Sequence, residues 1–322
     1  MDSIAAARRI HADKVDILID LKGYTRQNRL EIAALRPAPV QLAWLGFPGT
    51  SGADYFDYIV TDSVVTPSDA ADAYSEAFVV MPHCYQVNNR DQKIAEAPVL
   101  RAKAGLPEGA FVFASFNNTY KLEPVMFAAW MELLRDVPNG VLWFLPNNDF
   151  AIDNLRREAS AVGVEPERLI FAGMLPKAEH LKRASLVDLA LDTRIYNGHT
   201  TTSDMLWAGV PVITLKGTHF ASRVSASLLQ AFGLPELIME TLGSYRTLAH
   251  DIAQTPARYI ALRERVMALR QQSPLFDTRE FARDLERAYS EIWRRYNANE
   301  APRRLVVSET KPTTVNPLNF NR

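Results

Sequence analysis

The chain has 322 residues, which suits two domains under the soft prior of roughly 150 residues per domain. Hydrophobic residues make up 48% and charged residues 23%, a composition that is typical of a globular protein and excludes a disordered or fibrous one. The formal net charge of −1 provides no bulk attraction to nucleic acid or to an anionic membrane, so neither is expected as a partner.

Targeting and metal-binding signals are missing from this sequence. Its single cysteine, Cys84, cannot form an internal disulfide, and the first residues do not combine a basic region with an apolar run. No apolar stretch approaches the roughly 20 residues that cross a bilayer, so a cytoplasmic location is expected. The six histidines lie far apart and no Asp-x-Asp pair occurs, which predicts chemistry without a bound metal.

The first hundred residues predict short strands separated by helices and loops. A helical pattern begins near Ser3, and β-rich runs follow at residues 15–21, 40–45 and 58–62. The second run leads into residues 46–52, where three glycines and a proline exclude regular structure. A loop of this kind after a strand is where α/β folds bind ligands.

From about residue 111 strands and helices alternate at the spacing of a parallel sheet, which predicts a doubly wound α/β lobe. The expected strands are 111–116, 141–145, 169–172, 187–191 and 212–215, and the expected helices are 123–134, 153–162, 177–184 and 201–207.

The end of the chain predicts one amphipathic helix over residues 278–296 and then little regular structure. We therefore expect four parts. They are an N-terminal lobe over 1–95, a Rossmann-like C-terminal lobe over 96–275, a helix over 276–297 that packs back on the lobes, and a loosely ordered tail over 298–322.

Residues 197–204 are the first candidate ligand site, because they follow a predicted strand and open a predicted helix. A helix N-terminus attracts anions through its free N–H groups and its dipole, and Thr200 and Thr201 add hydroxyl donors suited to a diphosphate. Asp204, about one turn later, is placed to accept from ribose hydroxyls. The alternative is that residues 200–203 only cap the helix, which is the commoner role of such residues.

A second candidate site lies at the start of the helix predicted over 177–184. At about 100° per residue, Lys177, His180 and Arg183 share one basic face. The two cations are suited to phosphate and the imidazole to stacking on a base or bonding to it. The alternative is an ordinary solvated charged face.

The third candidate is Lys121, which follows the strand predicted over 111–116. A lysine at that strand end can neutralise charge on a departing phosphate, and such electrostatic stabilisation is often the largest catalytic contribution. A solvent-exposed loop lysine is the alternative. The three candidates gain weight together, because all follow strands of one predicted sheet. No His–carboxylate pair identifies a general base.

The sequence resembles the catalytic region of the O-GlcNAc transferase and SPINDLY-like glycosyltransferases, especially their bacterial members, from about Ala7 to Trp293. The most specific matching segments are residues 22–25, 35–41, 44–52, 197–201 with Asp204, and 206–209.

This resemblance implies an α/β fold of GT-B type, with two Rossmann-like lobes. It also implies an inverting, metal-independent transfer of a sugar from a UDP-sugar to Ser or Thr hydroxyls of an acceptor protein, with no cofactor besides the donor. By position in the motifs, Lys121 resembles the lysine that stabilises the leaving diphosphate, and His180 the residue that contacts uracil. Lys177 and Arg183 resemble the basic companions of that histidine.

The remaining site residues also follow from the resemblance. His199, Thr200 and Thr201 resemble the residues that contact phosphate, and Asp204 the partner of the ribose. Leu45 and Gly46 resemble the first-lobe loop that meets the donor sugar.

Two positions differ from the animal enzymes. Asn118 stands where they have glutamine, and we expect this shorter amide to reach the diphosphate region. Tyr196 stands where they have a cysteine close to the N-acyl group of the sugar, and bacterial relatives often carry tyrosine there. A bulky phenol at this position leaves the sugar unassigned. UDP-glucose and GDP-fucose are therefore kept as alternative donors.

Full-length relatives carry an additional His-bearing segment and tetratricopeptide repeats before the part matched here. The first lobe is therefore expected to be incomplete. A non-catalytic module that binds a nucleotide-sugar or a protein is kept as an alternative function for that reason. An enzyme acting on small molecules or lipids is a further alternative, although no amphipathic membrane helix is evident.

Overall fold

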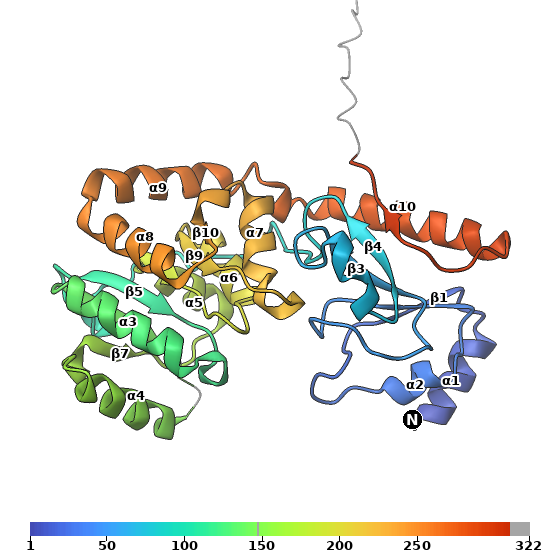
Figure 1. Cartoon of the computed structure of the whole chain (residues 1–322), viewed down its shortest axis with the longest axis horizontal. Helices are drawn as coiled ribbons and strands as arrows, with labels where there is room; N and C mark the ends of the chain where they lie inside the picture. The colour runs from blue at the N-terminus through green and yellow to red at the C-terminus, as the bar shows by residue number, and fades with distance from the viewer. Residues whose placement is uncertain (147, 310–322) are drawn as a thin grey trace, which may run out of the picture. The chain divides into compact units, whose positions relative to one another are not determined.

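The computed structural model describes residues 1–146 and 148–309, which form two compact units (Figure 1). The described part of the N-terminal unit is residues 1–63, 67–85 and 279–309, and that of the C-terminal unit is residues 64–66, 86–146 and 148–278. The long segment of the second unit thus begins at residue 86. The final helix of the chain is part of the first unit.

The N-terminal unit is built on a five-stranded sheet in the order β1-β2-β3-β4-β11, in which all neighbouring strands are parallel. Three α-helices accompany it. The elements are α1 (Ser3–Ala12), β1 (Ile17–Asp20), α2 (Leu30–Ala34), β2 (Val40–Ala43), β3 (Tyr58–Asp62), β4 (Ala77–Met81), α10 (Thr278–Asn297) and β11 (Leu305–Val306).

Helix α10 supplies one side of the core of this unit. Its buried Ala288 and Ile292 pack in one cluster with Leu42, Val60 and Val79 of the sheet. Apolar residues at helical spacing bury one face of a helix and leave the other in water. The amphipathic helix predicted over residues 278–296 is thus confirmed.

The described part of the tail contains structure that its composition did not predict. Residues Leu305 and Val306 form β11, which pairs in parallel with Val79 and Val80 of β4. Leu305 and Val307 are buried in the core cluster of this unit. A short apolar sequence thus gains order by completing a sheet edge. Residues 310–322 of the expected loose tail lie outside the described residues.

The C-terminal unit is a doubly wound α/β domain with six parallel strands in the order β10-β9-β8-β5-β6-β7. The expected alternation of strands and helices is confirmed. The elements are β5 (Phe111–Ser115), α3 (Pro124–Asp136), β6 (Gly140–Phe144), α4 (Asp149–Ala161), β7 (Leu169–Phe171), α5 (Lys177–Ala184), β8 (Leu189–Leu191), α6 (Thr200–Trp207), β9 (Val212–Leu215), α7 (Val224–Phe232), β10 (Ile238–Met239), α8 (Leu242–Gln254) and α9 (Pro256–Leu269).

The strand order fixes where a ligand site belongs in this domain. From β5 the chain proceeds outward through β6 and β7, and then returns to β8 on the other side of β5. The order therefore reverses between β5 and β8. Ligands of open α/β sheets bind at the carboxyl ends of the strands beside such a switch point.

Candidate active site

The loops after β5 and β8 lie at the switch point and, together with α6 (Thr200–Trp207), carry seven of the twelve predicted site residues. The first loop leads into a short 3-10 helix, η3 (Thr119–Lys121), and the second leads into α6. Parallel strands end at the same edge of a sheet, so these loops face one another. Direct contacts confirm this, because the Lys121 Nζ donates a 2.8 Å hydrogen bond to the carbonyl oxygen of Asn197.

A buried carboxylate that we did not predict holds the two loops together. Asp192 follows β8 and accepts hydrogen bonds from Asn117 Nδ2 at 2.9 Å, from the Gly198 N–H at 2.6 Å and from Thr214 Oγ1 at 2.7 Å. Burial raises the pKa of Asp192, and the hydrogen bonds, including one with Ser225, act against that rise. The sequence did contain a signal for Asp192, because it is a polar residue that directly follows a buried strand.

Gly198 allows the two loops to approach closely. A Cβ atom at this position would lie 2.4 Å from Thr202 Oγ1, 2.7 Å from Thr201 Oγ1 and 3.0 Å from Asn117 Oδ1. Two of those atoms are themselves bonded, because Thr201 Oγ1 donates to Asn117 Oδ1. Any larger residue would therefore push the start of α6 away from the loop after β5.

Lys121 is a partly buried cation at this edge. Its Nζ lies 4.0 Å from the centre of the Tyr196 ring, in addition to its bond with Asn197. Burial lowers the pKa of Lys121 to about 8, and the negative charge of Asp192 opposes that decrease. The lysine is therefore mainly protonated at pH 7 and lies in a weakly solvated position, where its charge acts strongly on a bound anion.

His199 presents a polar atom that is unpaired within the described residues. It occupies the N-cap position of α6, and its buried Nε2 has no hydrogen-bond partner there. Burial, and then the charge of Lys121, lower the pKa of His199 to about 3, so the ring is neutral at pH 7. Its ring centre lies 5.2 Å from that of Tyr196. A buried polar atom without a partner is costly unless a ligand supplies one.

The start of α6 distinguishes between the two interpretations of residues 200–203. His199 makes no side-chain capping hydrogen bond. Thr202 Oγ1 bonds to Ser225 Oγ, and Ser203 Oγ donates to the carbonyl oxygen of Thr200, so neither hydroxyl caps the helix N–H groups. The first N–H groups of a helix have no intrahelical partner. Simple capping is therefore not what these residues do here, and the helix start is left open to an anion.

Residues of α5 form a second cluster, in which the charges of Lys177 and Arg183 both act on His180. Lys177 Nζ bonds to both carboxylate oxygens of Asp204. Asp204 is only 6% exposed, and burial raises its pKa while the bond and charge of Lys177 lower it. The charge of Lys177 is thus paired within the protein, although its side chain remains 48% exposed.

Arg183 is buried, which contradicts a solvated face. It is 6% exposed, donates to the Gly173 carbonyl oxygen at 2.6 Å and stacks near Phe116 and Trp143. Its Nη2 lies 2.8 Å from Nδ1 of His180. Since arginine can only donate, Nδ1 is the acceptor and the proton of the neutral imidazole is on Nε2.

His180 is consequently a neutral hydrogen-bond donor. Burial, and then the charges of Arg183 and Lys177, lower the pKa of His180 to about 4. Its ring centre lies 5.4 Å from that of Phe116. A neutral ring of fixed tautomer suits the recognition of an uncharged base edge better than the binding of phosphate.

Three predicted site residues remain. One is exposed in the C-terminal unit, and two lie in the N-terminal unit. Asn118 is exposed at the start of η3. Leu45 and Gly46 belong to the N-terminal unit and follow β2. Leu45 has a φ of 72°, and a Cβ on Gly46 would lie 2.2 Å from the carbonyl oxygen of Leu21. This loop therefore requires glycine where it meets the loop after β1.

Within residues 1–146 and 148–309, no three His, Cys, Asp or Glu side chains gather where they could hold a metal ion. No helix in the same residues is long and apolar enough to cross a membrane.

Comparison with known proteins shows the family of this chain. The sequence model of glycosyl transferase family 41 matches residues 2–97 and 91–285. The chain belongs to this family. Similar curated proteins include the probable UDP-N-acetylglucosamine–peptide N-acetylglucosaminyltransferase SEC of Arabidopsis thaliana, which is 42% identical over 315 residues. The alignment covers 96% of this chain and 32% of that protein.

Other relatives give the same result. The probable UDP-N-acetylglucosamine–peptide N-acetylglucosaminyltransferase SPINDLY of Oryza sativa is 34% identical, over 98% of this chain and 34% of its own. This family 41 chain therefore spans about a third of the length of these curated relatives.

Solved structures confirm the GT-B type of α/β fold. A mutant O-GlcNAc transferase of Thermobaculum terrenum matches with a TM-score of 0.82 and 30% identity, over 93% of this chain and 57% of that one. The Anabaena protein HepE, solved with UDP and glucose, matches with a TM-score of 0.65 and 12% identity, over 90% and 81% of the two chains. At that identity the second match indicates the fold alone.

Proposed function

We propose that this chain is the catalytic core of a glycosyltransferase that moves a sugar from a UDP-sugar to Ser or Thr hydroxyls of proteins, with inversion and without a metal ion. The main supporting observation is the position of Lys121. Its Nζ is held 2.8 Å from the Asn197 carbonyl oxygen, beside the open N-terminus of α6. A partly buried cation and free helix N–H groups at one point form a site for a diphosphate.

In this proposal the diphosphate lies at the start of α6. The hydroxyls of Thr200 and Thr201, the first N–H groups of the helix and Nε2 of His199 supply hydrogen bonds. The acceptor oxygen attacks the anomeric carbon as the bond from that carbon to the diphosphate oxygen breaks. UDP leaves, and Lys121 stabilises the negative charge that develops on it. The acceptor proton passes to a base that we leave unassigned.

The nucleoside is assigned to the cluster at α5. His180, with its proton on Nε2, donates to a carbonyl of the base, and Arg183 holds the ring in that tautomer. Asp204 accepts from a ribose hydroxyl while it remains bonded to Lys177. A neutral donor favours uracil, whose carbonyl oxygens accept. The exposed Asn118 is close enough in sequence to Lys121 to contribute an amide near the diphosphate.

The curated relatives support the donor and acceptor classes. Their names describe transfer of N-acetylglucosamine from its UDP derivative to peptides. This chain spans about a third of those proteins, so the activity remains a proposal for it. Tyr196 lies under Lys121 in the C-terminal unit, where the sugar is expected. We also propose a cytoplasmic location, in agreement with a single, buried cysteine.

Lys121→Ala tests the proposal directly. We expect calorimetry to show micromolar UDP binding to the unmodified chain, with weaker binding of GDP. The rate of sugar transfer by the variant should fall at least about 100-fold, because the charge of Lys121 acts mainly on the leaving group. The affinity of the variant for UDP should change much less. Lys93→Ala, at an exposed position of the same unit, is the matched control.

Two results would contradict parts of this proposal. A folded chain that does not bind UDP would overturn the nucleotide site. UDP binding without transfer to any acceptor peptide would favour the alternative of a non-catalytic nucleotide-sugar-binding module. Comparing UDP-N-acetylglucosamine with UDP-glucose and GDP-fucose as donors would assign the sugar.

A further inference from the structure

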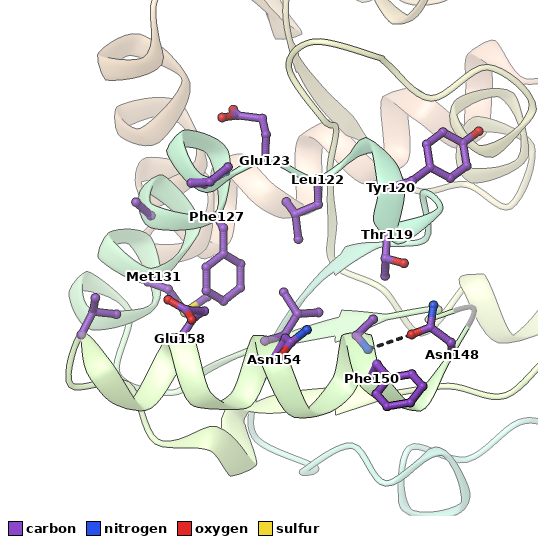
Figure 2. Close-up of a pocket in the computed structure, with 15 residues that line it drawn as sticks. Thr119, Tyr120, Leu122, Glu123, Phe127, Met131, Asn148, Phe150, Asn154 and Glu158 are labelled. Carbon is purple, nitrogen blue, oxygen red and sulfur yellow. Dashed lines mark hydrogen bonds between the residues drawn. The ribbon is translucent and has the colours of Figure 1, made fainter.

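A groove in the C-terminal unit lies outside the residues assigned to the donor. It has a volume of about 570 Å³ and runs between α3 and α4, which face each other across it (Figure 2). Phe127 and Met131 line it from α3, and Phe150 and Leu155 line it from α4. Phe150 is 82% exposed. Exposed apolar surface that is concentrated in one concave place indicates a binding site.

The groove begins at the proposed active site. Tyr120 and Leu122, on either side of Lys121 in the sequence, line its upper end. The Tyr120 ring centre lies 6.2 Å from that of Tyr196, and the Tyr196 ring lies under the Lys121 ammonium. One continuous series of aromatic contacts therefore leads from the groove to the catalytic lysine.

A second contact joins the groove to the loop after β8. Glu123, which also lines the groove, pairs with Arg194 at 2.9 Å. The same carboxylate accepts from the N–H groups of Val125 and Met126 and so begins α3. The upper end of the groove is thus fixed to both loops that form the proposed active site.

The dimensions of the groove suit an extended polypeptide. Its lining along α4 extends from Phe150 to Val162, twelve residues later, which is about 18 Å at the helical rise. An extended chain covers that length with about five or six residues. The amide of Asn154 lies along the α4 side and is suited to bonding a peptide backbone (Figure 2). Asn148 Oδ1 caps α4 by accepting from the Ala151 N–H at 2.9 Å, which leaves its Nδ2 as the donor toward a peptide.

We propose that this groove binds the acceptor polypeptide on one side of the hydroxyl that receives the sugar, which rests on the proposed function. The recognised segment has an apolar side chain that packs against Phe150 and Leu155. It also has a basic side chain near the carboxylate of Glu158, which lies about 12 Å farther along α4. That distance corresponds to about four residues of extended chain. This carboxylate is 59% exposed and pairs at the surface with Arg157 at 3.4 Å, so the peptide cation would share it with that arginine.

Peptide binding to the full chain tests this inference. We would use two fluorescein-labelled peptides of about 17 residues, each with a serine at its centre. One carries a phenylalanine and a lysine about four residues apart on the N-terminal side of the serine, and the other carries the same pair on the C-terminal side. Matched peptides carry alanine at both places. Fluorescence anisotropy with saturating UDP gives the Kd of each peptide, and calorimetry gives the Kd of UDP separately.

The double variant Phe150→Ser/Leu155→Ser should raise the Kd of one of the two Phe/Lys peptides about tenfold, because it removes the apolar contact. It should leave the Kd of the alanine peptide and the Kd of UDP unchanged. Ile260→Ser, at an apolar position of α9 that is 52% exposed, is the matched control. Glu158→Lys retains the apolar groove and lies on the surface, so it should fold normally. It should reverse the preference from lysine to glutamate in the peptide, whereas Glu264→Lys on α9 should not.

Three results would overturn the inference. The first is equal binding of the Phe/Lys and alanine peptides, and the second is an equal loss of binding in the α4 variants and their controls. The third is a preference for the same side chains at helical spacing, which would assign the groove to the helix of another protein. Failure of UDP to bind would overturn the proposed function instead, because the peptide preference is measured separately from UDP affinity.

Discussion

Two clusters of side chains at the same edge of the C-terminal sheet differ in how their charged groups are paired. In the α6 cluster, made of Lys121, Tyr196, His199, Thr200 and Thr201, the cation is matched by a carbonyl oxygen and an aromatic ring. A buried histidine nitrogen there has no partner within the described residues. Over the part of the chain that the structure describes, the Lys121 ammonium of this cluster thus has no salt bridge to a carboxylate.

In the α5 cluster, made of Lys177, His180, Arg183 and Asp204, most charged groups bond to one another. Lys177 pairs with Asp204, and Arg183 bonds to His180 and to a carbonyl oxygen, while its buried Nε has no partner among the described residues. The difference in how the two lysines are paired indicates separate tasks. A lysine without a carboxylate partner is suited to a ligand that brings negative charge, whereas a lysine paired with a carboxylate beside a neutral imidazole is suited to a base and ribose.

The largest expected effect on UDP binding comes from Gly198→Ala, which adds a side chain where the two loops of the α6 cluster meet. The new Cβ would lie 2.4 Å from Thr202 Oγ1, so the start of α6 must move away from the loop after β5. We expect UDP affinity to fall at least about tenfold and the free energy of unfolding to fall by about 1–3 kcal/mol. Calorimetry and urea denaturation measure the two effects.

Gly109→Ala is the control for that substitution, because a Cβ at Gly109 meets nothing within 4 Å. If both variants bound UDP as tightly as the unmodified chain, the α6 cluster would not be the diphosphate site.

A smaller effect should follow from the titration of Lys121. Burial lowers its pKa to about 8, so the free protein loses this positive charge as the pH rises through that value. We expect kcat/KM to fall about tenfold per pH unit above pH 8, since that ratio reports the ionisation of the free enzyme. Lys121→Arg keeps its charge, and its remaining activity should not show this decrease. The same alkaline decrease in both proteins would contradict the assignment.

The sequence predicted the alternating elements of the C-terminal unit because buried parallel strands are continuous apolar runs. It placed β5 at 111–116, where the structure has Phe111–Ser115, and α5 at its observed bounds. Helices α7, α8 and α9 were not predicted. They follow the last strand that we recognised, and β10, which completes the sheet beside them, has only two residues.

The pairing of site residues was harder to predict than their location. Lys121, His199 and the start of α6 were expected at one edge of the sheet, and their contacts show that they meet there. Periodicity also placed Lys177, His180 and Arg183 on one face, but it could not show that Asp204 would match one charge or that Arg183 would be buried. Those facts depend on residues 27 and 10 positions away, Asp204 and Gly173.

The smallest predicted effect concerns the α5 cluster and follows from replacing Arg183 with methionine, which keeps much of the apolar volume. Burial is the main cause of the low pKa of His180, and the charge of Arg183 is the second. The pKa of His180 should therefore rise above about 4 but stay below its ordinary value of about 6.5. NMR titration of the histidine ring measures this change, with Arg157→Met on the surface of α4 as the control.

The same substitution should affect UDP binding through the tautomer of His180. Without the guanidinium donor at Nδ1, the ring is free to place its proton on either nitrogen, so the Nε2 donor is present only part of the time. We expect UDP affinity to fall by a few-fold, less than for Gly198→Ala, because one hydrogen bond to a neutral base is weakened and the charge on the diphosphate is still matched. A loss of affinity for free diphosphate equal to that for UDP would mean that Arg183 supports the α6 cluster instead, and the division of tasks between the two clusters would fail.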